Sequence, residues 1–169
     1  MLSFSVVCFL ITQRADPKFA IIPGKSIGST AIGDDYEKVA ARIKKPNFGD
    51  AAMGRSWTTW IGKGGRLDIF AVRGRSDKPT VRLIRVSSPA FKLPNGLHVG
   101  SPLQDVLKAW PTLRRIHFMH GHSIWDDAKN GLVVEGLLNK CFALGVHASG
   151  QWADESYTAY LSGVSGVFK

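Results

Sequence analysis

The chain has 169 residues, 44% of them hydrophobic and 21% charged, and its formal net charge is +9 at pH 7. This composition is typical of a globular protein and excludes a disordered or low-complexity chain. Two cysteines are too few for a disulfide framework, and no apolar run reaches the roughly 20 residues needed to span a bilayer.

The first apolar run is LSFSVVCFLI at residues 2–11, which has the length of the hydrophobic region of a signal peptide. Two interpretations of residues 1–20 stay open, a signal segment or a buried N-terminal strand. The first predicts a periplasmic or secreted protein, which we expect. The second, with residues 1–15 retained as a strand, predicts a cytoplasmic one.

The segment PGKSIGST at residues 23–30 superficially suggests a phosphate-binding loop. It lacks the first glycine of the GxxxxGK[ST] pattern, in which backbone N–H groups surround the phosphates. We therefore interpret it as the approach to a helix.

Two stretches of the chain resemble each other at a constant offset of 67 positions. One is IGDDYEKVAARIKKP, which begins at Ile32, and the other is VGSPLQDVLKAWP, which begins at Val99. Each carries a residue typical of a helix N-cap, Asp34 or Ser101, followed three positions later by Glu or Gln. This spacing predicts two capping boxes, in which each cap side chain accepts a backbone N–H.

Both stretches also have apolar residues with helical periodicity, and Pro102 suits the first position of the second helix. The pattern predicts two helices of about three turns, at residues 34–45 and 101–110. The buried positions are Tyr36, Val39, Ala40 and Ile43 in the first helix, and Leu103, Val106, Leu107 and Trp110 in the second.

Several β-rich runs separated by Gly, Lys, Asp and Pro turns follow each predicted helix, and Asn130-Gly131 is a strong hairpin signal. The sequence therefore predicts an α+β fold of two tandem α-β-β-β repeats, with both helices packed on an antiparallel sheet. The expected boundaries are residues 21–92 for repeat 1 and 93–150 for repeat 2, with residues 151–169 as a C-terminal tail or edge strand.

Positive charge is concentrated in the first repeat. Residues 16–92 contain 15 Lys and Arg against 7 Asp and Glu, whereas residues 93–169 contain 6 of each. Trp57 and Trp60 lie near Arg55, and their odd spacing puts them on opposite faces of a strand, so we expect one to be buried and the other exposed. Aromatic and Arg side chains dominate interfaces, and the candidate binding residues are Arg55, Trp57, Trp60, Arg66, Arg73 and Arg75.

The run HFMHGH contains His117, His120 and His122, and imidazole pairs on one face of a strand bind zinc or copper. Gly121 favours a bend there, which would separate the rings. Cys141 and His147 are too far apart along one straight strand to form a catalytic dyad, so we expect Cys141 to be a buried, unreactive thiol.

The segments at residues 23–46, 50–57, 81–111, 130–136 and 140–147 resemble a group of mostly exported bacterial proteins. The duplication of a helix followed by a sheet also resembles the fold of the beta-lactamase inhibitory protein and of the small lipoproteins of outer-membrane assembly. This resemblance implies a concave sheet face that holds a protein partner, and it supplies no catalytic residues.

These observations predict a non-enzymatic binding module that needs no cofactor or metal and has a protein partner. Two alternatives stay open. One is a small metal-dependent hydrolase that uses residues 117–122, and the other is a module whose basic first repeat binds nucleic acid or another polyanion.

Overall fold

The computed structural model describes residues 16–43, 45–74 and 78–153. It begins with a short 3-10 helix, η1 (Pro17–Phe19), and three two-residue strands, β1 (Ile21–Ile22), β2 (Ser26–Ile27) and β3 (Thr30–Ala31). Helix α1 (Tyr36–Arg42) is followed by β4 (Phe48–Ala52), β5 (Arg55–Gly62), β6 (Gly65–Arg73) and β7 (Pro79–Val86). Helix α2 (Leu103–Ala109) is followed by β8 (Arg114–Met119), β9 (His122–Asp127), β10 (Leu132–Leu137) and β11 (Lys140–His147).

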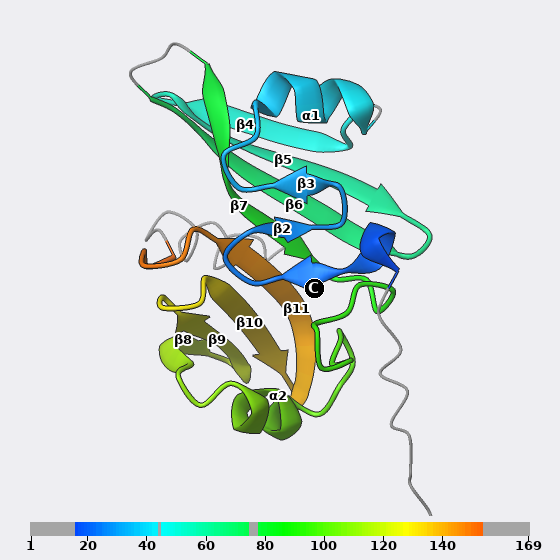
Figure 1. The fold of residues 1–169 in the computed structure, drawn as a ribbon, viewed down its shortest axis with the longest axis vertical. Coiled ribbons are helices and arrows are strands. Elements are labelled where there is room, and N and C mark those ends of the chain that lie inside the picture. The colour runs from blue at the N-terminus through cyan, green and yellow to red at the C-terminus, as the bar shows by residue number, and fades with distance from the viewer. Residues whose placement is uncertain (1–15, 44, 75–77, 154–169) are drawn as a thin grey trace, which may run out of the picture.

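The α+β prediction is confirmed, with one eight-stranded antiparallel sheet in the order β4-β5-β6-β7-β11-β10-β9-β8 (Figure 1). Each helix precedes four strands of this sheet, whereas we expected three, and in the first half the strand that was missed is β4, in the residues Phe48–Ala52. Antiparallel pairing of β7 with β11 joins the two four-stranded halves. That the halves are equivalent repeats with boundaries at residues 21–92 and 93–150 stays a prediction.

The two helices begin differently from the predicted capping boxes, which are wrong. Asp35 is the N-cap of α1 and accepts from the backbone N–H groups of Glu37 and Lys38, because the Asp34 carboxylate accepts from the Ala31 N–H at 2.9 Å. Pro102 occupies the N-cap position of α2 without a side-chain cap.

The Ser101 hydroxyl, which we expected to cap α2, accepts instead from the His98 N–H at 3.1 Å. In both cases the side chain predicted to cap the helix accepts a hydrogen bond from a backbone N–H of the preceding turn instead.

The predicted apolar stripes are confirmed, since all eight residues belong to the main core or pack against it. Val39 of α1 is 1% exposed and Val106 of α2 is 0% exposed. The helices contact β7 and β11, the two strands at the centre of the sheet. This side of the sheet is called here the helix-covered face.

Residues 21–31, interpreted from sequence as an approach to the helix, form a second, three-stranded sheet in the order β1-β2-β3. It packs on the helix-covered face, with Ile21 and Ile27 buried in the main core (Figure 1). Gly24 and Gly28 make its two turns possible, because both have a positive φ, at 73° and 54°. The main core is therefore enclosed by two helices and a small sheet.

The opposite side of the large sheet is called here the second face. It carries a separate apolar cluster, Trp57, Phe70, Leu83, Ile124, Val133 and Ala153. The expectations for residues 1–15 and for the tail beyond Ala153 lie outside the described residues. Within the part of the chain that is described, no helix is long and apolar enough to cross a membrane.

Candidate functional site

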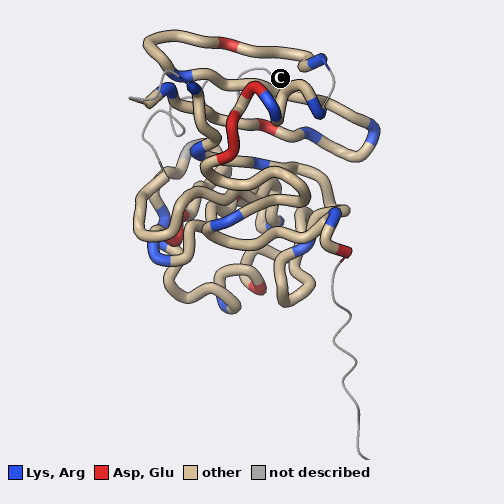
Figure 2. Tube along the Cα trace, turned by 45° about the horizontal axis from the view of Figure 1, so that its top comes forward, with Lys and Arg blue, Asp and Glu red and all other residues tan. Residues whose placement is uncertain are grey.

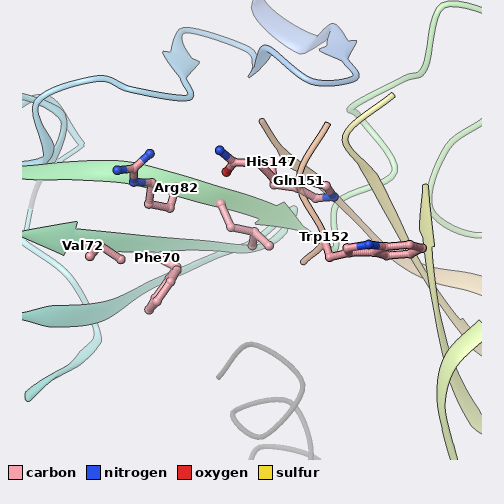
Figure 3. A pocket seen from close by; sticks show the side chains of 7 residues that line it. Phe70, Val72, Arg82, His147, Gln151 and Trp152 are labelled. Carbon is pink, nitrogen blue, oxygen red and sulfur yellow. The ribbon is translucent and has the colours of Figure 1, made fainter. Parts of the chain in front are cut away.

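A groove of about 310 Å³ lies on the second face, at the junction of the two halves of the sheet. Figure 3 shows Phe70, Val72 and Arg82 on neighbouring strands at one side and Trp152 at the other. The lining residues are Phe70, Val72, Arg82, Leu83, His147, Gln151 and Trp152. The groove thus combines an apolar floor with exposed polar and aromatic walls.

The floor follows from the two-residue period of strands β6 and β7. Phe70 and Leu83 are directly opposite each other and are both 2% exposed. The pairing then shifts, because Ala71 is opposite Val81, and Arg82 is the extra residue of a bulge. A bulge redirects a side chain that a regular strand would hold in the pleat, and Arg82 is exposed beside the floor.

The Trp152 wall is attached to the sheet through Asp126. The Ala153 N–H donates to one oxygen of the Asp126 carboxylate at 2.7 Å, and the His147 ring contacts the other at 2.8 Å. Asp126 is 0% exposed and His147 is 4% exposed, so these contacts are shielded from water. Trp152, held next to this anchor, is 63% exposed.

The hydrogen bonds of His147 limit its chemistry. Its Nδ1 lies 3.0 Å from the Ala148 carbonyl oxygen, which only accepts, so Nδ1 carries a proton. Its Nε2 faces the Asp126 carboxylate. Because both ring nitrogens are engaged, His147 offers the groove an apolar surface and no free base.

A network of buried charges lies on the same face. Arg85 donates to Asp68 at 2.8 Å and binds Glu135 through two nitrogens, and all three residues are at most 4% exposed. His122 lies 3.3 Å from Glu135, and the Phe142 ring lies 5.8 Å from the Arg85 guanidinium. The network therefore pairs each buried charge with an opposite one and links side chains of β6, β7 and β10.

The structure separates the two candidate tryptophans. Trp57 lies on the second face, 4.8 Å from the Phe70 ring centroid, and Trp60 lies in the main core. The placement on opposite faces is confirmed, but the expected exposure of one ring is wrong, because Trp57 is 9% and Trp60 is 8% exposed. Both indole rings are therefore buried, on opposite sides of the large sheet.

The candidate arginines lie in two places, with Arg66 apart from Arg55 and Arg73, which come together because Arg55 is paired with Val72. Arg66 donates to Asp68 at 2.6 Å and to the Thr59 hydroxyl at 3.2 Å, so it extends the buried network. Arg55 and Arg73 are exposed at the ends of β5 and β6, and Arg75 lies outside the described residues. Figure 2 shows that Lys and Arg outnumber Asp and Glu along the trace. The binding role of these arginines stays a prediction.

Trp60 and Arg66 also border a second, more open groove of about 390 Å³ between the end of α1, the β5–β6 hairpin and Phe91. Trp60 contributes little surface to it because its ring is buried in the main core.

The three histidines of residues 117–122 do not share a strand face. His120 and Gly121 form the β8–β9 turn with positive φ angles of 49° and 80°, so the expected bend is present. His122 instead faces Glu135. Among the residues that the structure describes, no group of three or more His, Cys, Asp or Glu side chains is placed to hold a metal ion.

Cys141 is buried at 1% exposure, on the helix-covered face, whereas His147 contacts Asp126 on the second face. Burial and the neighbouring Glu135 charge raise the pKa of the Cys141 thiol to about 12. The prediction of an unreactive thiol that forms no dyad is therefore confirmed.

Sequence analysis missed Trp152, Arg82 and Asp126. A solvent-exposed Trp has no distinguishing pattern in a single sequence, and Arg82 reads as an ordinary alternating strand position. The only available signal was the pair of acidic residues at the end of a β-rich run, Asp126-Asp127, one of which accepts from Ala153.

No protein-family model matches the sequence, and no curated protein is similar to it. Two solved structures are similar. One is an extracellular protein containing a SCP domain from Bacillus anthracis str. Ames, with 14% identity and a TM-score of 0.45, covering 70% of this chain and 44% of that chain. The other is a cysteine-rich secretory protein from Staphylococcus aureus subsp. aureus Mu50, with 9% identity and a TM-score of 0.47, covering 78% and 48%.

The chain thus spans less than half the length of both solved structures, and at these scores the likeness carries no argument about function or location. The expected resemblance to the beta-lactamase inhibitory protein and to outer-membrane-assembly lipoproteins is wrong, because the matching structures are SCP-domain and cysteine-rich secretory proteins. A helix-plus-sheet order is a local pattern that several folds share, whereas the long-range strand order decides which fold is formed.

Proposed function

We propose that this protein is a non-enzymatic binding module that holds a short segment of a protein partner in the groove of the second face. The observation that carries the proposal is the groove itself, in which the exposed Trp152 and Arg82 stand beside the buried Phe70 and Leu83. Trp and Arg are the side chains that most often dominate binding energy when they flank an apolar pocket.

The groove indicates the chemistry of the partner. Its volume of about 310 Å³ is at the lower end of the range for ligand pockets, which suits one or two side chains. Phe70, Val72 and Leu83 favour an apolar or aromatic side chain, and Arg82 favours a neighbouring carboxylate. Arg55 is paired directly opposite Val72, so it adds positive charge on the same face.

The described residues that line the groove offer no reactive group, which supports binding over catalysis. His147 has both nitrogens engaged, and the Cys141 thiol has a pKa raised to about 12 on the other face. The ring nitrogens of His147 face the Ala148 carbonyl and Asp126 rather than the groove, and the Cys141 thiol is protonated at neutral pH.

The proposal extends to origin and location. We propose that the two halves, each a helix with four strands, descend from one duplicated unit, which the offset of 67 positions between their helices supports. We also propose export, which the signal-like run at residues 2–11 supports. Superposition of residues 36–86 on 103–147 tests the first statement, and fractionation of the producing cells tests the second.

A peptide library selected against the full chain tests the binding function. We expect enrichment of short segments that place an apolar or aromatic residue beside Asp or Glu. In fluorescence anisotropy, Trp152→Ala and Arg82→Glu should each weaken an enriched peptide by about 30-fold, the effect of roughly 2 kcal/mol at a dominant contact.

Phe118→Ala is the matched control, because this side chain is 61% exposed but lies on the edge strand β8. Equal loss in the control and the groove variants would overturn the site. A library that enriches nothing, together with heparin retention that falls steeply with salt, would overturn the function in favour of polyanion binding.

A further inference from the structure

The apolar cluster of the second face is buried although only one of its described members, Ala153, lies outside the strands of the sheet. Five of its six buried members, Trp57, Phe70, Leu83, Ile124 and Val133, belong to strands of the sheet itself, and Ala153 is the sixth. Their strands, β5, β6, β7, β9 and β10, together with β11, extend over about 24 Å at roughly 4.8 Å per strand. One alanine methyl group is too small to cover side chains spread over this width.

The end of the described chain points to what covers them. Ala153 is a member of the cluster, and its N–H is held by the buried Asp126 at 2.7 Å, so residue 154 starts on the second face. The other end starts elsewhere, because Phe19 packs against Phe91 and Ile21 enters the main core. Of the two terminal segments, residues 154–169 therefore begin at the cluster.

The sequence of residues 154–169, DESYTAYLSGVSGVFK, suits an apolar surface. Its large apolar and aromatic residues recur at intervals of three, one, three, three and one positions, which is the spacing of one face of a helix. They are Tyr157, Tyr160, Leu161, Val164, Val167 and Phe168. Twelve residues in a helix extend over about 18 Å, which matches the greater part of the width of the cluster.

We propose that residues 154–169 dock on the apolar cluster of the second face, within the same chain, with Tyr157, Tyr160, Leu161, Val164 and Phe168 against the sheet. The tail is then an intramolecular ligand that completes a second core. The cluster shares Phe70 and Leu83 with the floor of the groove, so the tail and a peptide partner would contact two of the same side chains, and the test below measures the docking of the tail alone.

Thiol protection in the full-length chain tests the proposal. In a Cys8→Ser background, Leu161→Cys places a thiol on the docked face of the tail, and Ser162→Cys places the matched control about a third of a turn away. Cys141 stays silent because its pKa is raised to about 12. We expect a polar maleimide to modify Leu161→Cys at least about 10-fold more slowly than Ser162→Cys, at any protein concentration.

Equal modification rates would overturn the proposal, and so would protection that disappears on dilution, because the cover would then come from a second copy. A second pair of variants keeps the test independent of thiol chemistry. Leu161→Asp should increase the binding of a hydrophobic dye while the cooperative thermal transition persists, and Ser162→Asp should not. Equal dye binding by the two variants would also overturn the docking.

Discussion

The two faces of the large sheet are built on different principles. The helix-covered face is an apolar core, closed by α1, α2 and the small sheet, with Val86, Leu132 and Leu144 fully buried. The second face mixes an apolar cluster with buried charges, chiefly Arg85, Asp68, Glu135 and Asp126.

This difference shows how one sheet serves two purposes. The apolar face stabilises the fold through burial, which is non-directional and tolerates many sequences. The charged face fixes particular side chains, because each buried ion is hydrogen-bonded to a partner on another strand. The walls of the groove lie at the margin of this charged network. The candidate site therefore lies on the face whose geometry is more specific.

The largest expected effect is on the alkylation rate of Cys141, which reports whether water reaches the helix-covered face. With a pKa of about 12, the Cys141 thiol is deprotonated in roughly one molecule in 10⁴ at pH 8, against about one in ten for a thiol with the ordinary pKa of 9.0. In a Cys8→Ser background we expect alkylation to be about a thousandfold slower in the folded protein than in guanidinium. Similar rates in the two conditions would show that water reaches the main core.

Breaking the charge network should destabilise the second face most. Arg85→Ala removes the guanidinium between Asp68 and Glu135, and we expect it to lower the free energy of unfolding by about 3–5 kcal/mol. Arg82→Ala, on the same strand but exposed, should change it by less than about 0.5 kcal/mol. Urea titrations measure both, and a loss below about 1 kcal/mol for Arg85→Ala would mean that the network is solvated.

Gly131 lies where the β9–β10 turn contacts the small sheet, and we expect this position not to tolerate a side chain. A Cβ at Gly131 would lie 2.2 Å from the His147 carbonyl oxygen and 2.7 Å from Gly24 Cα, at a φ of 70°. We expect Gly131→Ala to cost about 2–4 kcal/mol, from steric overlap added to backbone strain.

Gly100→Ala is the control for strain alone, since φ is 97° there and nothing lies within 4 Å of a Cβ. It should cost about 1–2 kcal/mol in thermal or chemical denaturation. If both variants lose the same amount, the small sheet is not packed tightly against the β9–β10 turn.

The smallest expected effect is the pH dependence that comes from Asp127, at the end of β9. Burial raises the pKa of its carboxyl, but hydrogen bonds from Asn130 and Thr112 outweigh burial and hold the pKa below the usual 3.8. Because the folded-state pKa is lowered, this stabilisation is present above about pH 4 and disappears as the pH falls through the folded value.

We therefore expect the difference in unfolding free energy between the native protein and Asp127→Asn to shrink from pH 7 to pH 3. Asp105→Asn, at an exposed position of α2, serves as the control. A difference that does not vary with pH would show that the hydrogen bonds do not favour the ionised carboxyl.

Local patterns of the sequence determined a large part of this protein. The helical spacing of Val39 and Val106 placed both helices and their buried faces, and Asn130-Gly131 marked the β9–β10 turn. These features depend on periodicity and turn chemistry within a few residues, so they can be predicted without knowledge of the rest of the fold. The burial of Cys141 was predictable for another reason, which is that a free cysteine is among the most often buried residue types.

The tertiary structure decided the caps, the small sheet and the site. Asp34 and Ser101 have local partners that only the folded turns reveal, at Ala31 and His98. The groove joins residues 70–83 to residues 147–152, which come together because β7 pairs with β11. A sequence pattern with a two-residue period says which positions share a face, but not which distant strand will lie beside them.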